Sequence, residues 1–206
     1  MTVSGKNKII ISDVYAGEVW ICSGQSNMDM TVAKEDRYWC GVFNEAEEVT
    51  AANYPLIRVF DTDFTPSATP QNDVVGKWEI ISPQTVGHLS AVAYFFARDV
   101  QQKLKVPIGL ITTSYGASTA EAWVREEALI NEAVCKPLVD SFKRKLNKYN
   151  TDTTAQIKYL ADIEKWKADT AAAKAAGKNV PRGPRNPDPV RDQHNASVLW
   201  LSLIHI

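Results

Sequence analysis

The sequence has few cysteines, almost no net charge and no long apolar run. Its three cysteines, Cys22, Cys40 and Cys135, follow no metal-binding spacing, and their odd number argues against a disulfide framework. A net charge of −1 gives no basic surface for nucleic acid or an anionic membrane. No stretch reaches transmembrane length, and the polar residues 1–8 lack the apolar segment of a signal peptide. Nucleic-acid binding, membrane insertion and a disulfide scaffold are therefore not expected.

What is present suits a globular α/β domain. At 206 residues, with 45% apolar and 23% charged residues, the chain can bury a substantial core. Short β-branched runs predict strands, at residues 8–14, 17–22, 56–60 and 108–113. Apolar residues at helical spacing predict helices at 44–51 and after Ser90, the second ending before Pro107. Alternating helices and buried strands are typical of a doubly wound α/β fold.

Two capping-box patterns predict further helices toward the C-terminus. Ser118 and Glu121 predict a helix that begins near Thr119. Thr153 and Gln156 predict a second, which runs to about residue 177. The second helix has one apolar stripe, which we expect to pack on its own domain. Four prolines within residues 180–190 then indicate an extended, poorly structured linker.

Ser26 is the candidate nucleophile. It lies in the segment Gly24-Gln25-Ser26-Asn27-Met28, directly after the apolar run 19–22. A hydroxyl in a tight turn there would stand at the carboxyl edge of the sheet, where open α/β folds place their chemistry. The G-x-S-x-G elbow does not apply, because Met28 occupies its last glycine position.

Gly116 is the candidate oxyanion donor. It follows the predicted strand 108–113 and precedes the predicted helix near Thr119, where backbone N–H groups are unpaired. A glycine also lets a substrate approach the backbone closely. The alternative is an ordinary glycine in a turn between strand and helix.

Two ordered blocks give the chain a family resemblance. The first is Glu18 to Met28, and the second runs from Leu89 through Pro107 and Gly116 to Trp123. Together they resemble SGNH-type esterases of the sialate O-acetylesterase-like branch, over roughly Lys8 to Leu199. The resemblance implies a three-layer α/β/α sandwich with a parallel sheet, incomplete in this chain, plus a long helical insertion.

The same resemblance implies removal of acetyl groups from sugars such as sialic acid or xylan units, without a metal or organic cofactor. It implies that Ser26 and Gly116 are catalytic, and that Gln25 and Asn27 contact the acetylated carbohydrate. It also implies a periplasmic or extracellular natural protein, although this chain carries no export signal. One departure is Gly116-Ala117-Ser118, where the family usually has Gly-Gly-Thr.

Family members carry two later blocks that we expect to be missing. One is a Gly-x-x-Asn segment with a third oxyanion donor, and the other is an Asp-x-x-His segment with the base. Of the three histidines, His88 is expected to be a satisfied surface residue, and neither His194 nor His205 has the required aspartate three residues earlier. Asp29 is expected to cap the turn after it.

The resemblance also predicts the organisation of the chain. We expect residues 1–16 to end a preceding β-domain, 17–149 to begin the esterase domain, and 150–199 to form the helical insertion and linker. The resemblance ends at Leu199, and residues 200–206 are expected to be foreign to the natural protein.

Two other readings remain open. The first is a carbohydrate-binding module without a base, in which Trp39, Tyr115 and Trp123 stack on sugars. The second is an interaction protein that docks through the helix 153–178.

Overall fold

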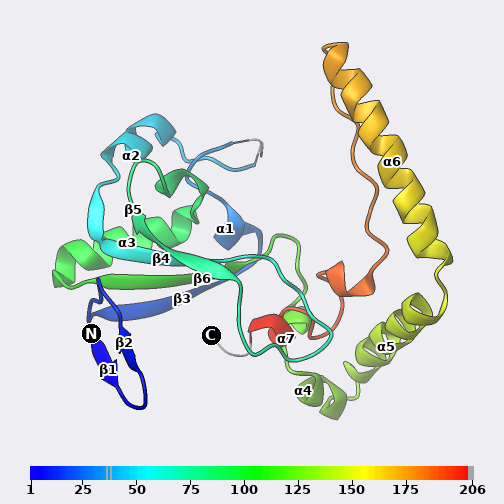
Figure 1. Ribbon diagram of the computed structural model, residues 1–206, viewed down its shortest axis with the longest axis horizontal. Helices are drawn as coiled ribbons and strands as arrows, with labels where there is room; N and C mark the ends of the chain where they lie inside the picture. Colours follow the sequence, from blue (N-terminus) through cyan, green and yellow to red (C-terminus); the bar gives the residue numbers. More distant parts are fainter. Residues whose placement is uncertain (36, 38, 204–206) are drawn as a thin grey trace. The chain divides into compact units, whose positions relative to one another are not determined.

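The computed structural model describes residues 1–35, 37 and 39–203, and these form two compact units (Figure 1). The first unit comprises Met1–Phe64 and Val75–Gly116. The second comprises Thr65–Val74 and the chain from Ala117 onward. Both predicted site residues, Ser26 and Gly116, belong to the first unit.

A four-stranded sheet forms the centre of the first unit. Its order is β3 (Glu18–Gly24), β6 (Ile108–Ser114), β4 (Tyr54–Thr62) and β5 (Gly76–Ile81). The strands β3, β6 and β4 are parallel, as expected, but β5 runs antiparallel to β4. The expected parallel sheet is thus confirmed for three strands, and β5 makes the sheet mixed at one edge. A parallel partner needs a crossover connection, usually helical, whereas the segment between β4 and β5 contains no helix.

The helix α3 (Ala91–Leu104) covers one face of this sheet (Figure 1). The Ser90 hydroxyl caps it by accepting a hydrogen bond from the Ala93 N–H at 3.3 Å, which confirms the predicted cap. Tyr94 is buried in the same core cluster as Ile57 and Leu110 of the sheet. Burial of these apolar side chains is the main stabilising contribution of the unit.

The opposite face of the sheet is open within the first unit. Val19, Ile21 and Trp78 are 62%, 60% and 52% exposed there. The first unit thus shows two layers of the expected three-layer sandwich. The smaller elements of the unit lie around it: the hairpin strands β1 (Thr2–Ser4) and β2 (Lys8–Ile10), the helices α1 (Ser26–Asp29) and α2 (Glu45–Ala51), and the 3₁₀ turn Val86–His88.

The second unit is helical. It contains α4 (Glu126–Asn131), α5 (Lys136–Thr151), α6 (Thr154–Ala175), α7 (Trp200–Leu203) and the 3₁₀ turns Ala120–Trp123 and Pro189–Arg191. Leu129, Val139 and Ala196 form its small core. No described helix is long and apolar enough to cross a membrane.

The expected burial of the apolar stripe on α6 is wrong. This helix buries none of its residues, and Ile157 and Leu160 are each 65% exposed. Its predicted capping box also does not form, because Gln156 Nε2 donates to the Tyr149 carbonyl at 2.8 Å instead. The proline segment that follows runs back along α6 (Figure 1), where Trp166 Nε1 donates to the Pro181 carbonyl at 2.7 Å. That segment is extended, as expected, but it is anchored.

The difference in burial between the sheet core and the apolar stripe of α6 predicts a difference in stability between two variants. Leu110→Ala in the fully buried β6 should lower the free energy of unfolding by about 2–5 kcal/mol, because it leaves a cavity. Leu160→Ala on the exposed α6 should change it by less than about 0.5 kcal/mol. Denaturant unfolding of both variants measures this, and equal losses would mean that the α6 stripe is packed.

Candidate active site

The parallel pairing of β3 with β6 brings Ser26 and Gly116 together. In the register of this pair, Gly24 lies opposite Ser114, and the Tyr115 N–H donates to the Gly24 carbonyl at 3.0 Å. A Cβ placed on Gly116 would lie 3.8 Å from Ser26 Oγ. The predicted nucleophile and the predicted oxyanion donor are therefore neighbours at the carboxyl edge of the sheet.

Gly24 permits the close turn that carries Ser26. A Cβ at Gly24 would lie only 2.8 Å from Cγ of Met28, which folds back over the turn. Glycine suits this position because any side chain here would have to displace the Met28 side chain. The chain thereby turns within one residue of the strand end, at Gln25.

In this structure the Ser26 hydroxyl is bound but not activated. It donates to Gln25 Oε1 at 2.6 Å, and the same oxygen accepts the Ser26 N–H at 3.0 Å. An amide oxygen is a poor proton acceptor, so Gln25 orients the hydroxyl without deprotonating it. Asn27, the other predicted substrate contact, is exposed on α1.

Asp29 interacts with residues distant in sequence, in place of the local capping expected of it. The Gly116 backbone N–H donates to its carboxylate, and Arg37 Nη1 lies 3.6 Å from Asp29 Oδ2. Burial raises the pKa of Asp29 above its ordinary value, against the lowering effects of Arg37 and the Gly116 N–H. The Gly116 N–H, which is predicted to bind an oxyanion, thus binds the Asp29 carboxylate in this structure.

Asp61 is a member of this edge that the sequence analysis missed. It lies near the end of β4, and its carboxylate accepts a hydrogen bond from the Thr112 hydroxyl of β6. Burial raises its pKa, and its negative charge also raises the pKa of Asp29. Its position directly after the predicted strand 56–60 was the available signal, by the same edge argument that identified Ser26.

The chain after Gly116 does not form the expected helix. At the predicted position the described chain has a 3₁₀ turn, Ala120–Trp123, and the Ser118 hydroxyl accepts a hydrogen bond from Trp123 Nε1 at 2.9 Å. The helix N-terminus proposed beside Gly116 is therefore absent from the described structure. Ala117 has a φ of 59°, in the left-handed region that favours glycine. This is the second position of the family's Gly-Gly-Thr, where Ala replaces Gly.

Neither His88 nor His194 hydrogen bonds to Ser26 in the described structure. His88 pairs with Glu79 at 2.8 Å, as a satisfied residue should, and His194 Nδ1 lies 2.7 Å from Asp192 Oδ1. Among the residues that the structure describes, Ser26 Oγ hydrogen bonds only to Gln25. His205 lies outside the described residues.

A Gly-x-x-Asn spacing does occur after Gly116, although the absence of the family block with the third oxyanion donor stays a prediction. Residues 183–186 read Gly-Pro-Arg-Asn. Asn186 Oδ1 accepts the Asp188 N–H at 2.9 Å, so its side chain stabilises a local turn. No Asp-x-x-His segment is present in the sequence.

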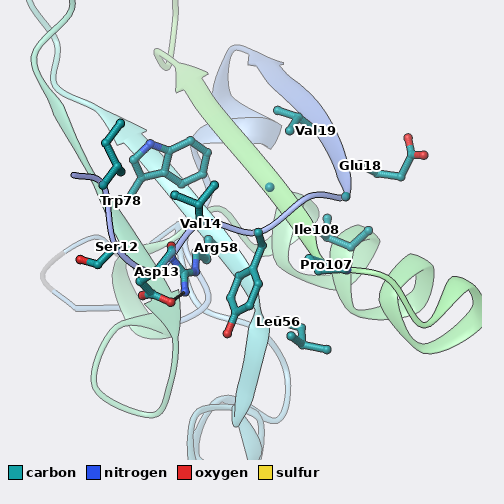
Figure 2. A pocket seen from close by; sticks show the side chains of 14 residues that line it. Ser12, Asp13, Val14, Glu18, Val19, Leu56, Arg58, Trp78, Pro107 and Ile108 are labelled. Carbon is teal, nitrogen blue, oxygen red and sulfur yellow. Dashed lines mark hydrogen bonds and ion pairs between the residues drawn. The ribbon is translucent and has the colours of Figure 1, made fainter. Parts of the chain in front are cut away.

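An apolar hollow of about 460 Å³ lies at the opposite, amino edge of the sheet (Figure 2). Tyr15 and Trp78 line it, and Arg58 is held there by Asp13 at 2.7 Å. Neither Ser26 nor Gly116 lines this hollow. We place the candidate site at the carboxyl edge because the hydroxyl, the oriented N–H and the carboxylates with raised pKa gather there.

The raised pKa of Asp29 predicts a pH dependence. Because the pKa of Asp29 is higher in the folded state than in the unfolded chain, the folded state binds this proton more tightly. The free energy of unfolding therefore keeps its full contribution from protonated Asp29 below about pH 4. That contribution is lost as the pH rises through the pKa of the folded state. The stability of Asp29→Asn relative to the unmodified chain should therefore increase from pH 3 to pH 7. Urea unfolding across this range measures it.

Asp140→Asn is the control with the opposite sign. A hydrogen bond from Lys136 holds the pKa of Asp140 below its ordinary value. The relative stability of this variant should therefore decrease as pH rises. Parallel trends for the two variants would contradict the assigned environment of Asp29.

Ala117 supplies a second prediction. Ala117→Gly should raise the free energy of unfolding by up to about 1 kcal/mol, because glycine relieves the left-handed backbone but makes the unfolded chain more flexible. Ala161→Gly in the exposed middle of α6 should instead lower it by about 0.5–1 kcal/mol. Thermal unfolding compares the two, and a loss at both positions would rule out strain at Ala117.

Comparison with known proteins shows the family of this chain. A family model described as "Carbohydrate esterase, sialic acid-specific acetylesterase" matches residues 16–158. Sialate O-acetylesterase of Rattus norvegicus is 34% identical over 128 residues, covering 58% of this chain and 22% of that protein. The Homo sapiens enzyme is 34% identical over 122 residues, covering 55% of this chain and 22% of that protein.

Among solved structures, a carbohydrate acetylesterase from Xanthomonas citri has a TM-score of 0.55 with 30% identity, over 62% of this chain and 28% of that one. The aligned part of this chain thus spans about a fifth of the length of the curated relatives. The family model covers more than half of the chain, with Ser26 and Gly116 inside the match. The chain therefore belongs to the carbohydrate esterase family of sialic acid-specific acetylesterases.

Proposed function

We propose that this chain carries the nucleophile and part of the oxyanion hole of a serine esterase that removes O-acetyl groups from sugars. The observation that carries the proposal is the close approach of Gly116 to Ser26 Oγ at the carboxyl edge of the sheet. Membership of the carbohydrate esterase family supports the substrate class. O-acetylated sialic acid, including its 9-O-acetyl form, and acetylated xylan are the two candidate substrates.

The chemistry needs Ser26 Oγ to attack the acetyl carbonyl. The attack forms a tetrahedral oxyanion, which the N–H groups of Ser26 and Gly116 would stabilise. Collapse releases the sugar hydroxyl and leaves acetyl-Ser26, and water then cleaves this ester to acetate and the free serine. For the oxyanion to bind, the Gly116 N–H must be released from Asp29.

We further infer that these 206 residues alone are a poor catalyst. The Ser26 proton is directed at an amide oxygen, and no imidazole hydrogen bonds to Ser26 among the described residues. An unactivated serine hydroxyl is a weak nucleophile, and loss of a triad base typically costs several orders of magnitude in kcat.

A second candidate function follows from the absence of a base beside Ser26 among the described residues. A chain without a base could still bind acetylated sugar, either through Trp39 and Tyr115 of the first unit or through Trp123 of the second. One face of Tyr115 is already stacked on Phe64 at 3.7 Å, so only its other face could meet a sugar. Calorimetric titration with acetylated sugars, in the absence of turnover, would support this alternative.

Acetate release tests the proposal. In the longest natural form of this protein, Ser26→Ala should lower kcat/KM for O-acetylated sialic acid or acetylated xylan by roughly a thousandfold or more. Ser23→Ala, on the preceding strand, is the matched control and should change kcat/KM less than about threefold.

The 206-residue chain should hydrolyse an aryl acetate at close to the buffer rate, with or without Ser26→Ala. Rapid turnover that Ser26→Ala abolishes would reveal a base that the described structure does not show. Turnover in the longest form that survives Ser26→Ala would contradict the serine mechanism.

A further inference from the structure

We propose that the second unit carries a binding site for the carboxylate of an acidic sugar, formed by Arg182, Arg185 and Arg191. The inference rests on the proposed function for the identity of the ligand as a sugar. The positive charge and shape of the site come from the second unit alone.

The three arginines line one hollow of about 350 Å³. The remaining lining residues are polar: Asn186, Asp192, Gln193 and His194. Asp192 is the single carboxylate of this lining, and it is already engaged by Arg185 Nη2 at 3.0 Å and His194 Nδ1 at 2.7 Å. Burial acts to raise the pKa of Asp192, but hydrogen bonds from His194 and the charge of Arg185 hold it below its ordinary value. The carboxylate is thus ionised, and its charge is used internally.

Two of the arginine charges are left for a ligand. Within the described part of the chain, Arg182 and Arg191 have no ion-pair partner, and both are exposed to solvent. Guanidinium groups bind carboxylates through paired, nearly parallel hydrogen bonds. An anionic ligand would therefore gain interactions that the free protein does not satisfy by itself.

The backbone that carries Arg182 and Arg185 is anchored at both ends, and Arg191 follows the second anchor by two residues. Trp166 Nε1 holds the Pro181 carbonyl at 2.7 Å, and Asn195 Nδ2 holds the Pro189 carbonyl at 2.6 Å. Lys145 in turn donates to Asn195 Oδ1 at 2.9 Å. The prolines between these anchors restrict the backbone further, which lowers the ordering cost of binding.

A neighbouring hollow of about 390 Å³ favours a sugar over a bare inorganic anion. It shares Arg185, Asn186 and Asp192 with the first hollow. Tyr149 and Asp152 also line it, and they could contact a sugar ring and its hydroxyl groups. A ligand with a carboxylate beside a polyhydroxyl ring would fill both hollows.

Calorimetric titration of the 206-residue chain tests the site, with N-acetylneuraminic acid as the probe. Its neutral methyl ester and inorganic phosphate are the comparison ligands. We expect saturable binding of the acid, weaker binding of the ester, and loss of affinity as salt is raised. The double variant Arg182→Gln/Arg191→Gln should weaken binding by roughly tenfold or more, since hydrogen bonds to charged groups are lost. Arg144→Gln, at an exposed arginine of α5 outside both hollows, should have no effect.

Ser26→Ala separates this inference from the proposed function, and it should leave binding of the acid unchanged. Binding lost in Ser26→Ala but kept in the double variant would place the sugar at the serine and overturn the inference alone. Equal binding of acid and ester, phosphate binding without binding of the sugar, or no binding would also overturn it. None of these outcomes bears on acetate release by Ser26.

Discussion

The parallel pairing of β3 with β6 is the constraint on which the candidate site depends. This pairing sets Gly24 opposite Ser114, so the turns after both strands begin side by side. The serine hydroxyl and the Gly116 backbone then lie close together. A slip of one residue in this register would turn the strand side chains to the opposite faces and separate the two turns. The buried α3 face of the sheet, with Leu110 at its centre, fixes the register.

Negative charge dominates the electrostatics of this edge. Asp29 and Asp61 are both partly buried, and burial raises the pKa of each. An oxyanion forming at Ser26 would meet the carboxylate of Asp29 unless that side chain turned toward Arg37. The Gly116 N–H can serve only one of these two anions at a time. Competition for one backbone donor is thus the physical link between the resting structure and the proposed chemistry.

The pairing of Ser26 with Gly116 could be predicted from the sequence because it depends on local rules. Each residue follows a buried strand, and parallel strands end at one edge. Asp61 was missed although the same rule applies to it, since it directly follows the predicted strand 56–60. The Thr119 helix was predicted wrongly, since the Ser118 hydroxyl binds the Trp123 indole instead of a helix N-terminus.

Longer-range features could not be predicted in the same way. The direction of β5 depends on how the chain returns after β4, which no local pattern encodes. The stripe on α6 has helical spacing, but spacing alone does not show what covers it. The anchoring of the proline segment depends in part on Trp166, which donates to the carbonyl of Pro181, 15 residues away in sequence.

Rapid-quench peptide mapping of the longest natural form during turnover of an acetylated sugar tests the central claim most directly. If Ser26 is the nucleophile, a transient acetyl group will be found on the peptide that contains Ser26, at a rate matching acetate release. An acetyl group on another residue, or acetate release without any acetylated peptide, would contradict the account.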